Sequence, residues 1–298
     1  MEVALYHPAQ GYYSSRIKSV GSRGDFTTTS QLSPLLARAI AQQFIQSDLR
    51  HLIEVGPGTG DLARAIWKEL SFLQKRRTQM HLVEVSTPLR TLQKQALPKV
   101  HHHTTIQTAL EACSGEAFIY SNELVDAFPV RVFRKENDGW SELFLSGSKG
   151  ELKEEFQPVS ELPHSTQFAG VHPLGQRIEI HESYRRWLSE WTPSFRGKIL
   201  TIDYVAPTPA PVTGTLRGYF LHDRLTGANL YQSAGQIDLT ADVHFDDLEY
   251  WGKEMGLDTL FRKSQHAFLR DFAEDNSTDQ YLIDPEGAGG AFEVLLQK

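Results

Sequence analysis

The sequence predicts an α/β fold with a mostly parallel, Rossmann-like sheet, and three observations support this prediction. From residue 52 onward, apolar strands alternate with helices whose apolar residues recur every three or four positions. The first of these strands ends in a glycine-rich turn at 56–60, and a further apolar strand returns at 198–204. Strands that alternate with helices pair in parallel through helical crossovers.

The bulk composition excludes several classes of protein. The 298 residues, 40% hydrophobic and 22% charged, suit a globular chain, and we assign 1–298 to a single domain. Cys113 is the only cysteine, so a disulfide within the chain is excluded and a reducing, cytoplasmic location is expected. Residues 1–5 begin neither a signal nor a transit peptide. The net charge of −7 disfavours a nucleic-acid partner. No apolar run is long enough for membrane insertion. The sequence leaves open whether the protein forms a homo-oligomer.

The elements follow one another along the chain. Residues 11–28 are glycine-, serine- and aromatic-rich and predict a loop with short extended pieces. Ser33 and Pro34 have the form of an N-cap and a first helical residue, and they precede an apolar helical face. A strand at 80–85 leads through Ser86 into a second helix, and a third strand is expected at 117–123.

The middle of the chain has a different pattern. Short alternating strands separated by glycine-containing turns predict a β-rich insertion at 134–180, before the core strand at 198–204.

The glycine turn indicates the ligand. A dinucleotide fingerprint has the spacing G-x-G-x-x-G, but here the third glycine comes one place early, as Gly56, Gly58 and Gly60. Glu54 precedes the turn, and an acidic strand end suits the amine and sulfonium of S-adenosylmethionine better than a pyrophosphate. Pro57 and Gly58 suit the centre of a type II turn, in which the second position needs φ > 0. The alternative is a tight turn without a ligand.

Glu84 ends the second strand. A carboxylate at this place is the natural partner of two ribose hydroxyls, because ligands bind at the carboxyl ends of parallel strands. The alternative for Glu84 is a solvated surface carboxylate.

With these motifs in view, the sequence resembles the MidA family of class I methyltransferases along nearly its whole length. The matching segments are His7-Pro8 with Gly11-Tyr12-Tyr13, Gly24 to Thr28, Glu54 to Gly60, Leu82 to Glu84 with Leu89-Arg90, Ser121 to Val130, Ile202 to Tyr204, Thr215 to Tyr219 with His222, and Asp238 to Val243. The resemblance implies S-adenosylmethionine as cofactor. It also implies a protein substrate, since the mitochondrial members methylate an arginine of a complex I subunit.

The resemblance also implies roles for further residues. Asp25 and Thr28 are expected at the cofactor, and Asp203, Tyr204 and His222 at the substrate. The chain departs from the family at Val205, where relatives have glycine, and at His244, where they have aspartate. Relatives usually carry a further helix before His7, which leaves open a missing start and with it a location in the mitochondrial matrix.

Asn122, Glu123 and Asp126 are the predicted catalytic residues. Methyl transfer is an in-line displacement, so the protein mainly aligns the nucleophile with the methyl group. An arginine acceptor is cationic like the cofactor, and two unit charges about 4 Å apart repel by roughly 4 kcal/mol at an effective dielectric constant of about 20. Carboxylates offset this repulsion, orient the guanidinium and can accept its proton. The alternative is that Asn122 and Asp126 brace a turn before Pro129.

Other signals are weaker. His101, His102 and His103 alternate faces in an extended chain, so no metal site is expected. Cys113 shows no activating pattern. Besides a protein-arginine methyltransferase, the sequence leaves open a small-molecule methyltransferase, an assembly factor that keeps the cofactor pocket without turnover and, more distantly, a nicotinamide oxidoreductase.

Overall fold

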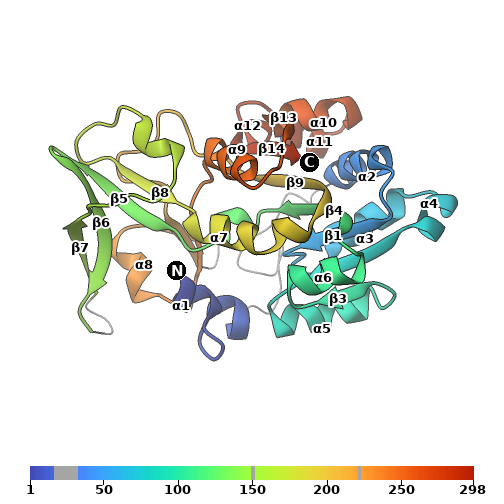
Figure 1. Cartoon of the computed structure of the whole chain (residues 1–298), viewed down its shortest axis with the longest axis horizontal. Helices are drawn as coiled ribbons and strands as arrows, with labels where there is room; N and C mark the ends of the chain where they lie inside the picture. The colour runs from blue at the N-terminus through green and yellow to red at the C-terminus, as the bar shows by residue number, and fades with distance from the viewer. Residues whose placement is uncertain (17–32, 149–151, 221–222) are drawn as a thin grey trace.

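A seven-stranded sheet, in the order β13-β14-β9-β4-β1-β2-β3, forms the centre of the computed structural model, which describes residues 1–16, 33–148, 152–220 and 223–298 (Figure 1). The strands of this central sheet are β1 (His51–Val55), β2 (Gln79–Val83), β3 (His101–His103), β4 (Glu116–Asn122), β9 (Arg196–Tyr204), β13 (Thr259–Ser264) and β14 (Phe292–Gln297). Parallel pairs join β4 to β1, β1 to β2, β2 to β3 and β4 to β9. Only β14 runs against its described neighbours, so the predicted mostly parallel sheet is confirmed.

Except for two that pack beside a smaller sheet, the helices cover both faces of the central sheet. They are α1 (Glu2–Tyr6), α2 (Leu35–Ser47), α3 (Asp61–Glu69), α4 (Phe72–Arg77), α5 (Thr87–Ala96), α6 (Ile106–Ala112), α7 (Glu182–Trp191), α8 (Ala228–Gln232), α9 (Phe245–Glu254), α10 (Gln265–Leu269), α11 (Ser277–Ile283) and α12 (Ala288–Ala291), with shorter helical turns at η1 (Tyr12–Arg16), η3 (Val125–Ala127), η4 (Thr166–Ala169), η5 (Thr192–Ser194) and η6 (Arg270–Phe272). One core contains α6, α7 and α9, and the other contains α2, α3, α10 and α11.

The two cores explain the near-continuous apolar runs of the central strands. Successive residues of a strand point to opposite faces, so Leu52 and its neighbour Ile53 enter different cores. Their partners on β4, Phe118 and Ile119, divide in the same way. A parallel strand that is buried on both faces therefore needs apolar residues at consecutive positions.

The predicted helix starts hold with small shifts. The Ser86 hydroxyl accepts a hydrogen bond from the Leu89 N–H and caps α5. The Ser33 hydroxyl accepts one from the Leu35 N–H, and α2 begins at Leu35, one residue later than expected. The prediction of a loop at 11–28 is wrong for residues 12–16, which form the helical turn η1. Residues 17–28 lie outside the described residues.

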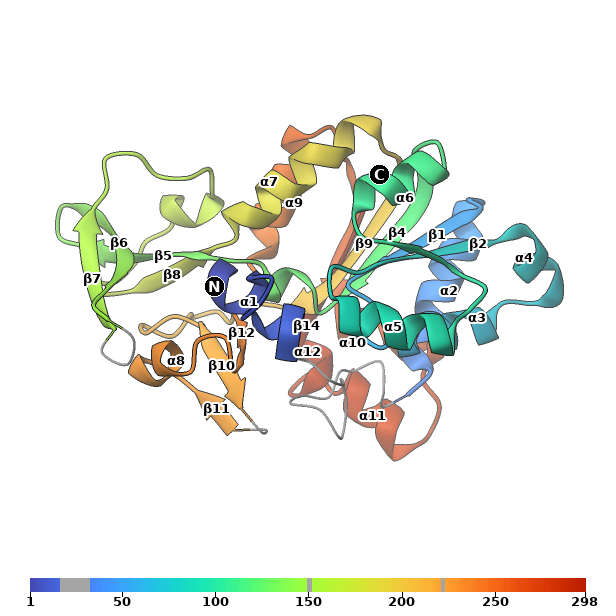
Figure 2. The same cartoon turned by 90° about the horizontal axis from the view of Figure 1, so that it is seen from below.

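Two smaller antiparallel sheets complete the described fold. The sheet β7-β6-β5-β8 consists of β5 (Arg131–Glu136), β6 (Gly139–Ser146), β7 (Lys153–Pro158) and β8 (Arg177–Ile180), so it starts three residues before the expected insertion boundary. The sheet β11-β10-β12 consists of β10 (Arg217–Phe220), β11 (Asp223–Leu225) and β12 (Asp238–Thr240), and it lies beside α1 and α8 (Figure 2). The assignment of the whole chain to one domain stays a prediction.

The three consecutive histidines form β3, an edge strand that the sequence analysis did not predict. Their neighbour His81 places its Nδ1 3.0 Å from Nε2 of His103 and its Nε2 3.1 Å from Nδ1 of His51. These imidazoles thus bond to one another across three strands. Within the described parts of the chain, no helix is long and apolar enough to cross a membrane.

Candidate active site

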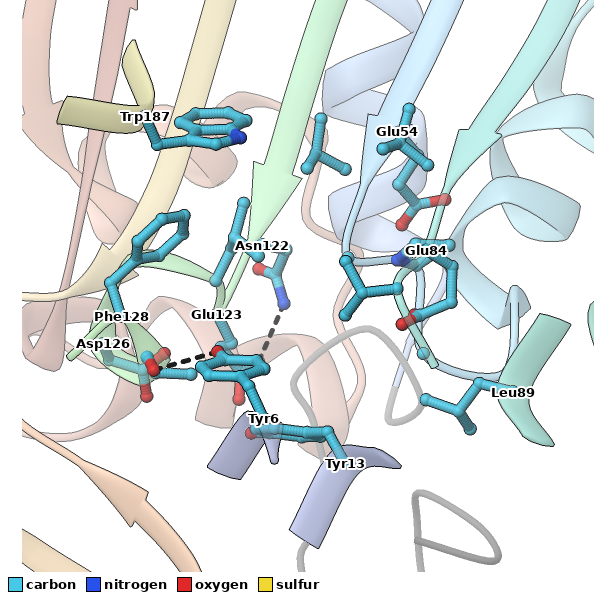
Figure 3. A pocket seen from close by; sticks show the side chains of 18 of the residues that line it. Tyr6, Tyr13, Glu54, Glu84, Leu89, Asn122, Glu123, Asp126, Phe128 and Trp187 are labelled. Atoms are coloured by element: carbon cyan, nitrogen blue, oxygen red, sulfur yellow. Dashed lines mark hydrogen bonds between the residues drawn. The ribbon is translucent and has the colours of Figure 1, made fainter. Parts of the chain in front are cut away.

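A cavity of about 850 Å³ opens at the carboxyl ends of β1, β2 and β4 (Figure 3). One half of it is lined by Glu54, the glycine turn and Glu84. The other half is lined by the segment 122–129, which follows β4 and includes η3, and we call this segment the β4 loop. The cavity therefore lies where open parallel sheets bind ligands, and where the sequence predicted a site.

Gly58 has the left-handed backbone predicted for it, and Gly56 and Gly60 share this conformation. The φ angles of Gly56, Gly58 and Gly60 are 68°, 53° and 84°. The Gly60 N–H donates to the Pro57 carbonyl over 2.8 Å, so the hydrogen-bonded turn spans 57–60, one residue beyond the predicted type II turn. A Cβ on Gly56 would lie 2.7 Å from Cδ1 of Leu124, so glycine lets the β4 loop approach β1. Gly56 and Gly58 line the cavity, whereas Gly60 starts α3 behind it.

Glu54 is a buried carboxyl at the end of β1. It is 3% exposed, and its Oε2 accepts a hydrogen bond of 2.9 Å from the Tyr120 hydroxyl. Burial raises the pKa of Glu54 to about 8. A buried carboxyl whose ionisation is this unfavourable fits a cationic ligand group, which would favour the ionised form.

Glu84 lies just past the end of β2 and is only 6% exposed. Its Oε1 accepts a hydrogen bond of 2.8 Å from the Ser86 N–H, and burial raises the pKa of Glu84 to about 7. This carboxyl lines the cavity, so it is not the solvated surface group of the alternative interpretation. Its contact with ribose hydroxyls stays a prediction.

Glu123 has an unusual backbone for its residue type. Its φ is 53°, in the left-handed region that few residues other than glycine adopt. The Glu123 N–H donates to the Ile202 carbonyl over 3.0 Å, and the Asn122 amide donates to Oε1 of Glu123 over 2.8 Å. Strained conformations of this kind cluster at functional sites, and both side chains line the cavity.

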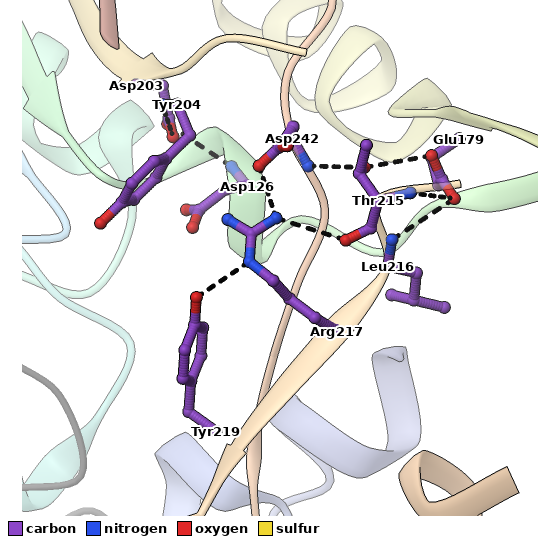
Figure 4. A network of polar contacts seen from close by, with 9 residues as sticks. All are labelled: Asp126, Glu179, Asp203, Tyr204, Thr215, Leu216, Arg217, Tyr219 and Asp242. Carbon is purple, nitrogen blue, oxygen red and sulfur yellow. Dashed lines mark hydrogen bonds and ion pairs between the residues drawn. The ribbon is translucent and has the colours of Figure 1, made fainter. Parts of the chain in front are cut away.

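Asp203 holds the β4 loop from behind (Figure 4). Its Oδ2 accepts hydrogen bonds from the Leu124 N–H at 3.0 Å and the Val125 N–H at 2.7 Å, and its Oδ1 accepts one from the Tyr204 N–H at 2.9 Å. Asp203 is fully buried and does not line the cavity. The Asp203 carboxylate thus binds backbone N–H groups, and its expected direct contact with substrate stays a prediction. Tyr204 does line the cavity.

Asp126 is 5% exposed and lines the cavity in front of Asp203. Burial, followed by the repulsion from Asp203, raises the pKa of Asp126 well above its ordinary value. Burial also raises the pKa of Asp203, to about 7, although hydrogen bonds from backbone N–H groups favour its ionised form. The nearby guanidinium of Arg217 is already paired with Asp242 and donates to the Tyr219 hydroxyl over 3.0 Å (Figure 4).

Comparison with known proteins identifies the chain. Residues 35–262 match the model of a family described as S-adenosyl-L-methionine-dependent methyltransferase. The chain belongs to this family. It is also similar to a protein from Burkholderia thailandensis whose crystal structure contains bound S-adenosyl-homocysteine, with 26% identity, a TM-score of 0.86, and coverage of 100% of this chain and 86% of that one. A native structure from the same organism, at 25% identity, gives a TM-score of 0.83 and covers 85% of that chain.

A human relative, named protein arginine methyltransferase NDUFAF7, mitochondrial, is 26% identical over 100% of this chain and 74% of its own length. The corresponding protein of Xenopus tropicalis is 27% identical over 92% of this chain and 71% of its length. The expected cytoplasmic location gains no support from these relatives, since both names say mitochondrial.

S-adenosylmethionine is thus the cofactor of this methyltransferase, and the cavity fits it. The buried carboxyls of Glu54 and Glu84 suit a cationic, hydroxyl-bearing ligand, and the glycines keep side chains out of the space between them. Asp25, Thr28 and His222 lie outside the described residues.

The methyltransferase site also contains residues that the sequence analysis missed. The Tyr6 hydroxyl donates to the Ala127 carbonyl over 3.0 Å, and the Tyr13 hydroxyl donates to Oδ1 of Asp238 over 2.7 Å. The two tyrosine rings stack with their centroids 5.6 Å apart (Figure 3). The pair Tyr12-Tyr13 was noted only as part of a family motif, because nothing in the sequence says what α1 and η1 pack against.

Proposed function

We propose that this methyltransferase transfers the methyl group to an arginine side chain of a protein. The observation that carries the proposal is the acidic half of the cavity, where Glu123, Asp126 and Asp238 all line the wall. Arg217, on the same wall, is neutralised by Asp242. A site with this charge balance favours a cationic acceptor.

The acceptor half also has an apolar wall. The rings of Phe128 and Trp187, with centroids 5.5 Å apart, line the cavity on the side of the β4 loop away from Glu84 (Figure 3). Such a wall suits the aliphatic stem of an arginine and can contact its guanidinium face. The side chain would then present its charged end to Glu123.

S-adenosylmethionine, when bound, supplies a methyl group activated by the sulfonium. The residues of this chain hold the guanidinium against the repulsion between two cations, a task for which carboxylates are suited. Glu123 orients the guanidinium and accepts its proton, and Asp126 adds negative charge when the arriving cation favours its ionised form. Asn122 fixes the Glu123 carboxylate through the hydrogen bond from its amide.

The names of the curated relatives support this acceptor. A small-molecule methyltransferase and a factor without turnover are the alternatives. Incubation with radiolabelled cofactor and a cell lysate separates them, since the proposal expects label in protein. The label should be recovered as methylarginine after acid hydrolysis.

Glu123→Gln tests the role of the carboxylate. The variant keeps the shape of the side chain and removes its charge, so methyl transfer should fall roughly a hundredfold or more, as expected for loss of a positioned acid–base group. Cofactor affinity should stay within a few-fold. Glu111→Gln, at an exposed position on α6, is the matched control. Peptides with lysine in place of arginine should fail, because an ammonium lacks the planar fork. Full transfer by the glutamine variant would overturn the assignment.

We also propose a mitochondrial location, because the names of the relatives say mitochondrial, and within it the matrix, the alternative that the sequence left open. Protease protection of fractionated organelles tests this location. The protein should resist protease until the inner membrane is opened, and recovery in the cytosolic fraction would contradict the proposal.

A further inference from the structure

A second polar surface lies in the cavity, on the small sheet that the sequence analysis did not predict. Arg217 pairs with Thr240, and Tyr219 pairs with Asp238, across the antiparallel strands β10 and β12. Residues directly opposite each other in such a pair point to the same face, so these four side chains share one face. All four line the cavity. We call this surface, formed by Arg217, Tyr219, Asp238 and Thr240, the β10–β12 face.

The β10–β12 face adjoins the acceptor half of the cavity. The Ala241 N–H, next to Thr240, donates to the Asp126 carbonyl over 3.0 Å. The Arg217 guanidinium carbon lies 5.5 Å from the centroid of the Tyr204 ring. The face is therefore joined to the β4 loop, beside the place where the proposed arginine would be held.

Thr240 gives the strongest sign that this face binds a ligand. Thr240 is only 5% exposed, yet its hydroxyl has no hydrogen-bond partner among the described residues. A buried polar group without a partner costs about 1–3 kcal/mol, and such groups are rare in native proteins. A ligand that bonds to the Thr240 hydroxyl would remove this cost.

The composition of the face defines the chemistry of the ligand. Arg217 is a donor that already bonds to Asp242 and Tyr219, and Asp238 is an acceptor that already bonds to Tyr13. The hydroxyls of Tyr219 and Thr240 can both donate and accept. A guanidinium has only donors and would leave the donors of this face unused. A peptide group offers a carbonyl acceptor and an N–H donor side by side, and it matches the mixed set.

We propose that the β10–β12 face binds a peptide group of the acceptor chain next to the methylated arginine. This inference rests on the proposed arginine methylation and specifies the substrate further. A polypeptide acceptor fits this face better than a free guanidino compound, which would leave the donors of the face unused. The side chain and the neighbouring backbone of the substrate are then held by separate walls of one cavity.

Calorimetric titration of the full chain, saturated with S-adenosyl-homocysteine, tests this inference with three probes. They are acetyl-glycyl-arginyl-glycine amide, its citrulline counterpart, and n-butylguanidinium. The arginine peptide should bind at least tenfold more tightly than n-butylguanidinium. Thr240→Val, which removes the hydroxyl at nearly constant shape, should abolish most of this advantage and leave n-butylguanidinium within twofold. Thr240→Ser should keep the advantage, and so should Thr192→Val, at a buried threonine outside the cavity.

The outcomes separate this inference from the proposed function. Equal binding of the arginine peptide and n-butylguanidinium, binding of none of the probes, or an equal loss of both ligands in Thr240→Val overturns the peptide subsite. If the citrulline peptide binds as tightly as the arginine peptide and still depends on Thr240, the subsite stands and the arginine proposal fails. Unchanged affinity for S-adenosyl-homocysteine in each variant shows that the fold and the cofactor half are intact.

Discussion

Replacement of Glu54 by glutamine should stabilise the cofactor-free protein at neutral pH, and the gain should depend on pH. Burial raises the pKa of Glu54 from 4.5 to about 8. Between these two values the folded protein keeps a proton that the unfolded chain has lost, so stability falls as pH rises through this window. Each pKa unit corresponds to about 1.36 kcal/mol, so this group removes about 2.5 kcal/mol of stability between pH 5 and pH 7. Glutamine does not titrate and escapes the loss.

Urea denaturation of both proteins at pH 5, 6, 7 and 8 measures this effect. The free energy of unfolding of Glu54→Gln relative to the parent should increase by about 2.5 kcal/mol from pH 5 to pH 7. The exposed Glu111→Gln is the control, and its difference from the parent should stay constant within about 0.5 kcal/mol. A difference for Glu54→Gln that is independent of pH would refute a protonated, buried Glu54. The same variant should bind S-adenosyl-homocysteine at least tenfold more weakly at pH 8, since it cannot become an anion.

Three further variants test other parts of the site. Glu84→Ala should weaken cofactor binding by about 1.5–3 kcal/mol in calorimetric titration, and Glu84→Gln should recover part of the loss. If both variants bind the cofactor as tightly as the parent, Glu84 does not contact the ribose. Gly58→Val should fold but lose cofactor binding, because valine resists the φ of 53° and its side chain would occupy the cavity. Parental cofactor affinity of the folded variant in calorimetric titration would contradict this prediction. Asp203→Asn should lower kcat at least tenfold with cofactor affinity within threefold, since an amide cannot accept all the backbone hydrogen bonds that hold the β4 loop. An unchanged kcat would show that the loop holds itself.

The sequence predicted those elements whose signals are local. The strand that ends at Val55 and the helix capped by Ser86 were predicted because apolar runs and capping residues lie next to each other in the chain. The strand β3 was missed because three histidines carry no apolar signal and its pairing with β2 depends on tertiary structure. The small sheet β11-β10-β12 was missed for a related reason, since its strands have only three or four residues each.

The same distinction holds for the site. Glu54 lies near the end of a strand, and Glu84 and Glu123 follow strands directly. Their place at one edge of the sheet could therefore be predicted from the chain order. Asp203 also lies near the end of a predicted strand. The hydrogen bonds of its carboxylate, however, depend on how β9 lies against β4. The roles of Arg217 and Asp238 depend on a small sheet that no local sequence pattern predicts.

The spread of the cavity wall along the chain determines when the site can form during synthesis. The strands β1 to β4 are neighbours in the sheet and leave the ribosome first, so they can pair before the rest of the chain exists. The cavity wall also includes Tyr6, which precedes β1 in the chain, and Thr240, which is made much later. A nascent chain that ends before β12 would therefore carry the glycine turn without the wall opposite it. The acceptor half of the cavity can therefore be completed only after most of the chain has been made.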